Sequence, residues 1–183
     1  MSRPNSKEAI LEAAEAVVIK AGAARLTLDA VAEQANLSKG GVMYNYPTKE
    51  ALLEAMFGRL QERHEQARQR ARQELSPDAP NELWVEIKML LGMDTGTDNR
   101  LSAALLAVIA NQPELPPPFC EEHRDRFNRD VAPAQSFERS SILFFAALGL
   151  HFHELLKFQL LTPEQRDRIK DSLLQLATSN TSI

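Results

Sequence analysis

The chain has 183 residues, of which 44% are hydrophobic and 25% charged, and its formal net charge is -4. This length fits one domain or two small ones and is too short for an elaborate multidomain enzyme. The single cysteine, Cys120, excludes an internal disulfide, and the N-terminus lacks the apolar stretch of a secretory signal, so we expect a cytoplasmic protein. The longest apolar run, Ile142 to Leu150, is well short of the about 20 residues that a membrane helix needs.

Residue usage predicts an all-α fold. Leu, Ala, Glu, Gln and Arg dominate, whereas Val, Ile and Tyr are scarce, and this balance favours helix over sheet. The charges are unevenly divided: residues 1–73 contain 11 Lys and Arg against 9 Asp and Glu, and residues 74–183 contain 10 against 16. A polyanionic partner is therefore expected to meet the N-terminal part, although so small a positive balance is a weak signal by itself.

Four helices are predicted in the first 75 residues, and polar residues mark their ends. Ser6 caps the first helix, whose apolar residues recur at helical spacing until Gly22 stops it. Thr27 caps the second helix, and Asn36, which tolerates the left-handed conformation, turns the chain after it. Ser38 immediately caps a third helix. The second and third helices are therefore expected to lie close together, joined by a short turn.

The third helix spans only about two turns, because Pro47 disfavours helical backbone at Tyr46. Thr48 starts a long fourth helix, whose far half, RLQERHEQARQRARQEL, is nearly all polar. We expect this half to be a solvated rod that joins two parts of the chain. Pairs such as Glu65 with Arg68 stabilise it along its surface.

The segment SPDAP, residues 76–80, marks the predicted domain boundary. We expect a helix-turn-helix domain over residues 1–50, a connecting fourth helix over 51–75 and a second domain over 76–183. Apolar periodicity and start signals predict five more helices in the second domain. They are expected at Glu82–Met93, Asp98–Asn111, Pro118–Arg129, Gln135–Gln159 and Pro163–Ala177. The last has the best-specified start, because Thr162 and Gln165 form a capping box around Pro163.

The short third helix opens with two glycines, Gly40 and Gly41, which build no core. Two helices joined by a tight turn are typical of a helix-turn-helix, whose second helix enters the major groove of DNA. Glycines there would let the backbone approach bases and phosphates closely. Tyr44 and Asn45 supply hydrogen-bonding groups for phosphate oxygens, and Lys49 adds a positive charge. Close packing between helices is an alternative reason for the glycines, and the pattern leaves both open.

The stretch LTLDAVAEQANLSKGGVMYNYPTKEALLEAM, Leu26 to Met56, strongly resembles the DNA-binding domain of TetR-family transcriptional regulators. It shares a Thr-started second helix, a Ser-Lys-Gly opening of the recognition helix, and an aromatic-Pro-Ser/Thr-Lys-Glu-Ala-Leu junction. The resemblance is specific over about residues 6–56. Met43 stands where many members have Tyr, with the aromatic one place later at Tyr44, and Tyr46 replaces the usual Phe as a core residue.

The resemblance implies a set of DNA contacts. Phosphate contacts are expected from Thr27, Ser38, Tyr44, Asn45 and Lys49, and groove contacts from Lys39, Gly40, Gly41 and Met43. It also implies a C-terminal helical domain that binds a small-molecule effector and forms a homodimer through the last two helices. The whole protein is therefore expected to be all-α, with an N-terminal three-helix helix-turn-helix domain and a C-terminal ligand-binding and dimerisation domain.

The sequence supports dimerisation independently. The helix around SSILFFAALGLHFHELLKF is apolar nearly all round, and its small residues Ala146, Ala147 and Gly149 allow close helix approach. A four-helix bundle with the partner's copies would bury it. Its other members are expected to be Ile169, Leu173 and Leu176. The alternative is that this helix is the central core strut of a monomer.

Apolar and aromatic residues of the second domain are candidates for lining the effector pocket, although most such residues simply pack as core. The candidates are Trp84, Met89, Met93, Leu105, Ile109, Phe119, Phe145, His151 and Phe152. Acidic and basic side chains are sparse in the predicted interior, so an apolar or aromatic effector is favoured.

Two short patterns are weaker signals. Asp94 to Gly96 matches the aspartic-protease triplet, but that chemistry needs two carboxylates on loops of a β-rich fold. Cys120 and His123 have half of a zinc site's spacing, and no second pair follows. We therefore expect no catalytic residue, metal or cofactor.

The sequence predicts a ligand-responsive DNA-binding transcriptional regulator, a repressor released from a palindromic operator by a small molecule. A helical ligand-binding or interaction protein without DNA binding is the alternative, and the near-neutral N-terminal charge is the one feature that favours it.

Overall fold

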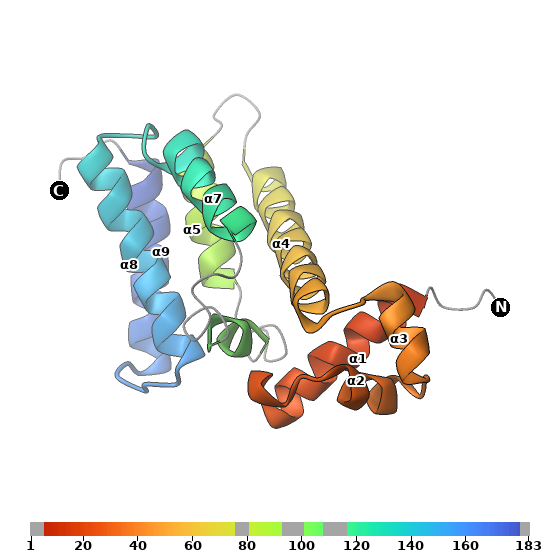
Figure 1. The fold of residues 1–183 in the computed structure, drawn as a ribbon. Helices are drawn as coiled ribbons and strands as arrows, with labels where there is room; N and C mark the ends of the chain where they lie inside the picture. Colours follow the sequence, from red (N-terminus) through yellow and green to blue (C-terminus); the bar gives the residue numbers. More distant parts are fainter. Residues whose placement is uncertain (1–5, 76–80, 93–100, 108–116, 180–183) are drawn as a thin grey trace. The chain divides into compact units, whose positions relative to one another are not determined.

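A computed structural model describes residues 6–75, 81–92, 101–107 and 117–179, with the side chains of 117–120 left undescribed. Within these ranges every regular element is a helix, which confirms the all-α prediction (Figure 1). A further short helix covers residues 101–107. The other elements are α1 (Ser6–Ala21), η1 (Ala23–Arg25), α2 (Leu28–Ala35), α3 (Lys39–Asn45), α4 (Lys49–Gln73), α5 (Glu82–Gly92), α7 (Pro117–Arg126), the π-helical η2 (Phe127–Val131), α8 (Phe137–Leu155) and α9 (Pro163–Thr178).

Helix ends agree best with the sequence where a cap defines them. The capping box of α9 is formed: the Gln165 backbone N–H donates to Thr162 Oγ1 (3.3 Å), and the Thr162 N–H donates to Gln165 Oε1 (2.9 Å). The prediction for α8 was too long, because the helix ends at Leu155 and the chain turns through positive φ at Lys157 and Gln159. The α-helix of α7 ends at Arg126 and continues as η2.

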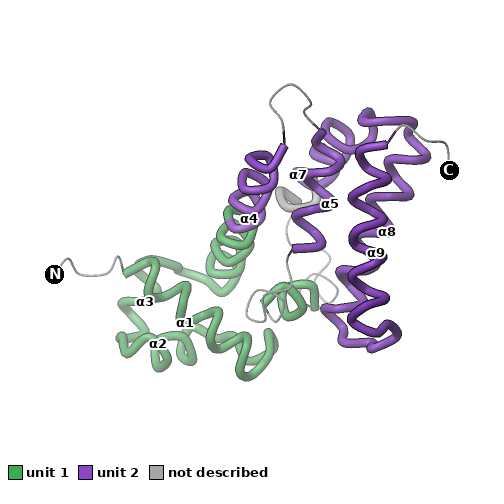
Figure 2. The backbone as a smooth tube through the Cα atoms, turned by 180° about the vertical axis from the view of Figure 1, so that it is seen from behind, with its two compact units in different colours: residues 1–62, 100–116 green, residues 63–99, 117–183 purple. Residues whose placement is uncertain are grey.

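The chain divides into two compact units. Residues 1–62 and 100–116 form unit 1, and residues 63–99 and 117–183 form unit 2 (Figure 2). The division between the first two ranges falls inside α4, so this helix belongs to both units. The boundary predicted at residues 76–80 lies outside the described residues.

Unit 1 has an aliphatic core gathered from four helices and the loop before α2. The core side chains are almost completely inaccessible, and each buried side chain of this size stabilises the fold by about 1.5–3 kcal/mol. They include Ile10 and Val18 of α1, Leu26, Val31 of α2, Val42 of α3, and Leu52, Leu53 and Met56 of α4. This core fixes α3 through Val42 and leaves the rest of that helix at the surface.

Unit 2 has its own apolar core, built by α5, η2, α8 and α9. One face of α8, with Leu143, Ala147 and Leu150, is buried in it. Leu173 of α9 is also buried there, so the prediction that it faces a partner subunit was wrong. Helical spacing alone does not show which apolar residues of α9 the chain itself covers. For this reason the sequence could not separate Leu173 from residues that face a partner.

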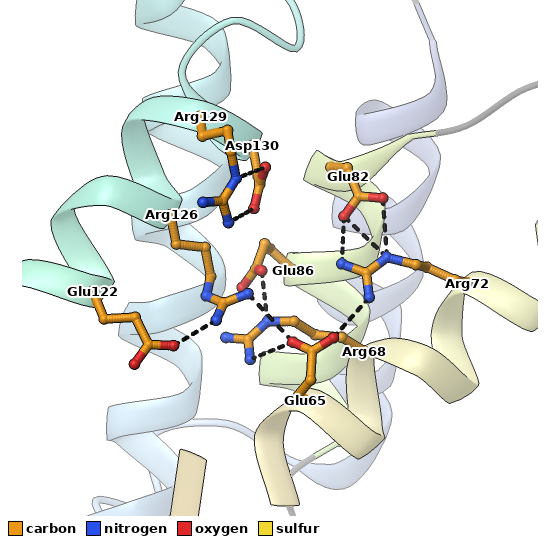
Figure 3. Close-up of polar contacts among 9 residues, drawn as sticks. All are labelled: Glu65, Arg68, Arg72, Glu82, Glu86, Glu122, Arg126, Arg129 and Asp130. Carbon is orange, nitrogen blue, oxygen red and sulfur yellow. Dashed lines mark hydrogen bonds and ion pairs between the residues drawn. The ribbon is translucent and has the colours of Figure 1, made fainter. Parts of the chain in front are cut away.

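The prediction of a solvated polar rod was wrong for the far half of α4. Arg68 and Ala71 are buried, and Arg68 Nε donates to Glu86 Oε1 of α5 at 2.6 Å (Figure 3). The expected Glu65–Arg68 ion pair is present at 3.7 Å. The charges of α4 are neutralised by acidic residues of α5 and a basic residue of α7. The sequence pattern of α4 alone cannot reveal these partners.

Within the described ranges no helix is both long and apolar enough to cross a membrane.

Candidate nucleic-acid interface

Local hydrogen bonds build the turn between α2 and α3. Thr27 Oγ1 accepts from the Ala30 N–H at 3.1 Å and begins α2. Asn36 adopts φ 55° and ψ 43°, the left-handed conformation, and the Leu37 N–H donates to the Ala32 carbonyl at 2.9 Å to close the helix end. Ser38 Oγ then accepts from the Gly41 N–H at 3.1 Å. The roles of Thr27, Asn36 and Ser38 follow from residue type, and together these contacts confirm the predicted helix-turn-helix.

The helix α3 buries one side and exposes the other. Val42 is buried, whereas Met43 is exposed and 89% of Tyr44 is accessible. Tyr46, just past the helix, is buried as predicted, and this burial raises the pKa of its phenol. A large aromatic side chain left almost fully in solvent beside Met43 contributes nothing to this unit's core. The outer face of α3 is therefore free to contact another molecule.

The polar groups around α3 keep hydrogen-bonding capacity beyond the contacts they make in the fold. The hydroxyls of Thr27 and Ser38 accept the capping bonds and still have an O–H to donate. Asn45 Nδ2 donates to the Gly41 carbonyl at 3.0 Å, which leaves its second N–H and its oxygen available. Lys49, in the first turn of α4, has no ion pair among the described residues.

The two glycines of α3 differ in their surroundings. A side chain at Gly41 would lie 3.4 Å from Ser38 Oγ, in van der Waals contact with the cap. A side chain at Gly40 would meet no described atom within 4 Å, and Gly40 does not have positive φ. Because glycine weakens a helix by up to about 1 kcal/mol relative to alanine, Gly40 has no evident role in the fold. Close helix packing, the alternative reason, does not explain it.

Sequence reasoning missed two features of this surface. Lys39 Nζ lies 2.9 Å from Asp29 Oδ2 of α2, so the cation at the start of α3 is held in place by a surface ion pair. Lys20 and Arg25 line the same surface hollow as Thr27, and with Glu33 in its lining the hollow has one more positive than negative side chain. Both features join different helices, and helical periodicity within one segment does not predict such contacts.

The candidate pocket residues are not brought together as one described site. Met89 and His151 are buried in unit 2, Trp84 and Phe152 are partly buried, and 58% of Phe145 is exposed. Leu105 is buried but belongs to unit 1. The remaining candidates, Met93, Ile109 and the side chain of Phe119, lie outside the described residues, as does the Asp94 to Gly96 triplet. The described residues contain no group of three or more His, Cys, Asp or Glu positioned to hold a metal ion.

Comparison with known proteins assigns the family. A family model of the bacterial regulatory proteins of the tetR family matches residues 10–56, which span α1 to the start of α4. A second, the tetracyclin repressor-like C-terminal domain, matches residues 86–178, just over half of the chain. The chain belongs to the TetR family and is a DNA-binding transcriptional regulator. Such regulators are generally non-enzymatic.

Solved structures share the fold over nearly the whole chain. A TetR-family member from Streptomyces coelicolor is 22% identical, with a TM-score of 0.74 over 94% of this chain and 98% of that one. The multidrug binding protein EbrR complexed with malachite green is also 22% identical, with a TM-score of 0.72 over 94% of this chain and 98% of its own. A comparison with curated proteins finds no match.

Proposed function

We propose that this regulator is a homodimeric repressor that binds a two-fold symmetric operator through α3 and leaves it when a small molecule binds unit 2. The observation that carries the proposal is the outer face of α3, where Gly40 borders open space and Tyr44 is almost fully exposed. A helix whose exposed first turn contains a glycine, which has no side chain, can closely approach a major groove about 12 Å wide.

Each predicted contact has a defined role in this proposal. Lys39, Gly40, Gly41 and Met43 lie on or near the leading turns of α3 and face the groove. The phosphate contacts are Thr27, Ser38, Tyr44, Asn45 and Lys49, whose hydroxyl, amide and ammonium groups donate to phosphate oxygens. Phosphate contacts fix the orientation of the protein on the duplex, and groove contacts select the sequence.

Dimerisation is proposed through the exposed face of α8 and the neighbouring α9. Ile142, Phe145, Ala146 and Gly149 recur at helical spacing and are all exposed, and Ile169 of α9 is exposed as well. An exposed apolar stripe of this kind on α8, with Ile169 beside it on α9, favours burial against a second copy. Two copies would present two recognition helices to half-sites about one helical turn apart.

The effector is proposed to be an apolar or aromatic compound. EbrR, which shares this fold, has been solved in complexes with malachite green and with ethidium, both organic compounds with several aromatic rings. The ionic side chains described in unit 2 are largely paired with one another, which leaves apolar surface as the main means of attracting such a ligand.

Selection of bound sequences from a random DNA pool tests this function. We expect a palindromic site, and binding that weakens with salt at a log-log slope of about -5 to -7 if about 3–4 of the five proposed phosphate contacts in each subunit release a counterion. Lys49→Ala in both subunits should lower the magnitude of that slope by about 2 and weaken all sequences equally. Purified protein that retains no duplex DNA at low salt would refute the proposal, and an asymmetric site would refute the dimer.

A further inference from the structure

Among the methionines of the described residues, Met43 alone is exposed. Met43 on α3 is 43% exposed, whereas Met56 of α4 and Met89 of α5 are 0% and 5% exposed. Met1 and Met93 lie outside the described residues. Met43 therefore presents much of its side chain, which ends in a thioether, to solvent on the outer face of α3.

The surface one helical turn before Met43 is open. A helical side chain leans toward the N-terminus of its own helix, over the residues three and four places earlier, which here are Gly40 and Lys39. Gly40 has no side chain, and a Cβ atom placed there would meet no described atom within 4 Å. The Lys39 side chain reaches Asp29 of α2, with 2.9 Å between Nζ and Oδ2. A small solute can therefore approach Met43 from this side.

An accessible thioether reacts with peroxides to give a sulfoxide. A lone pair of the sulfur attacks one oxygen of hydrogen peroxide, and the S–O bond forms as the O–O bond breaks. The proton on the transferred oxygen passes to the leaving hydroxide, which becomes water. The sulfur loses two electrons and the peroxide gains them. The product is polar and chiral, whereas the thioether is apolar, and methionine sulfoxide reductases reverse the change.

We propose that Met43 is a peroxide-sensitive site on the DNA-reading face, and that its oxidation to the sulfoxide lowers the affinity of the regulator for its DNA site. This inference rests on the proposed function, because it takes the exposed face of α3 as the face that enters the groove. Apolar contacts to base edges are one means of reading sequence there. The residue of α3 that lies in the core is Val42, so oxidation of Met43 alters the surface and leaves the core intact.

Two consequences of the added oxygen weaken DNA binding. A sulfoxide that takes the place of an apolar contact in the groove loses its hydration without gaining a matched donor. An unmatched polar group of this kind lowers affinity by a factor of about 5 to 150. The sulfoxide oxygen is also an acceptor, and Lys39, four residues earlier on the same face of α3, is a donor within reach. A hydrogen bond between them draws Lys39 away from the bases that it is proposed to contact.

The test uses the full chain with Cys120→Ser as the parent protein, because the single cysteine is a second target of peroxide. The DNA is a site that this parent selects from a random pool. After treatment with hydrogen peroxide, peptide mass mapping should find sulfoxide at Met43, with Met56 and Met89 still reduced. DNA affinity should fall at least about 5-fold, and reductases for both sulfoxide epimers should restore it. Bound DNA should slow the oxidation of Met43, because it covers the same face.

Two leucine variants of the parent locate the effect. Met43→Leu lacks the thioether on α3 and keeps every other methionine, so its affinity for DNA should be the same before and after peroxide. Each protein is compared only with itself, so a change that the substitution makes to DNA binding does not enter. Met89→Leu is the matched control, because it removes a buried methionine of unit 2. Its affinity should fall with peroxide as that of the parent does.

The outcomes separate this inference from the proposed function. A reduced parent protein that selects no DNA refutes the proposed function before peroxide is used. If the parent binds, unchanged affinity after full conversion of Met43 to the sulfoxide overturns the inference, as does an equal loss in Met43→Leu. A loss that the reductases do not reverse also overturns it, and this result needs no variant at Met43. Loss of helical circular dichroism on oxidation would overturn it as well, because the protein would then have unfolded.

Discussion

Apolar packing and one ionic cluster, Arg59 with glutamates of α1, hold the first half of α4, whereas ion pairs hold most of the second. In unit 1, Leu52, Leu53 and Met56 of α4 are buried, as is Val42 of α3. In unit 2, the same helix presents Glu65, Arg68 and Arg72 to charged partners (Figure 3). One continuous helix thus has two kinds of attachment.

The difference bears on what each half can do. Close-packed aliphatic side chains have few alternative arrangements, so the first half of α4 positions α3 rigidly. Ion pairs among long side chains can exchange partners when several candidates lie within reach. Glu65 has two such candidates, Arg72 and Arg126. A regulator needs both properties: a fixed reading surface and an adjustable connection to the part that senses the effector.

The largest effect is expected from the buried pair. Glu86→Ala leaves the Arg68 guanidinium buried without its main partner, and should lower the free energy of unfolding by about 3–5 kcal/mol. The double variant Arg68→Met, Glu86→Leu should recover most of that loss, because it removes both charges. Urea denaturation of the three proteins measures this. If the double variant is as unstable as Glu86→Ala, the unpaired buried charge is not the cause of the lost stability.

An intermediate effect is expected from pH. Burial, together with Arg68, His123, His151 and Arg126, lowers the pKa of His64 from 6.5 to about 3. Between these values the unfolded chain binds a proton that the folded chain does not, so the unfolding free energy falls as the pH is lowered. The His64 contribution between pH 6.5 and 5 is at most about 2 kcal/mol, and less because the side chain is partly exposed.

His64→Gln isolates that contribution. Urea denaturation at pH 7 and pH 5 should show a smaller loss of stability on acidification for the variant than for the wild type. If the free energy of unfolding depends on pH in the same way in both proteins, burial and neighbouring cations do not lower the pKa of His64.

A small effect on stability, with a clear effect on recognition, is expected at Lys39. Its ion pair with Asp29 is exposed on both sides, so Lys39→Ala should change the unfolding free energy by less than about 0.5 kcal/mol. It should relax base preference at particular positions of the selected DNA site. Lys88→Ala is the matched control, because Lys88 makes a similar exposed ion pair with Glu74 in unit 2. Unchanged site selection by Lys39→Ala would remove Lys39 from the groove contacts.

The sequence predicted unit 1 more accurately than unit 2 for a physical reason. The roles of Thr27, Asn36 and Ser38 depend on backbone groups within a few residues, so residue type and spacing are enough to infer them. The Arg68–Glu86 pair joins residues 18 apart on different helices. A charged run on one helix has the same sequence pattern whether it faces solvent or a second charged helix. This is why α4 was predicted to be solvated.

The same limit applies to the apolar residues of α8 and α9. Periodicity identified Ile142, Phe145 and Leu173 as apolar helix positions, but it did not distinguish the exposed pair from buried Leu173. That distinction depends on which neighbouring helix covers each face, and the chain fixes it only through packing over long sequence separations.

The central claim is that α3 is shaped for a partner rather than for the fold, and Gly40→Ala tests it most directly. The added methyl group meets no described atom, so the variant should be as stable as the wild type or up to about 1 kcal/mol more stable. If Gly40 faces the groove, DNA affinity should fall by about 1–3 kcal/mol, which is about 5- to 150-fold. Gly58→Ala in α4, where a methyl group also meets no described atom, should leave DNA affinity unchanged. A Gly40→Ala protein that binds its selected DNA site as tightly as the wild type would contradict the account.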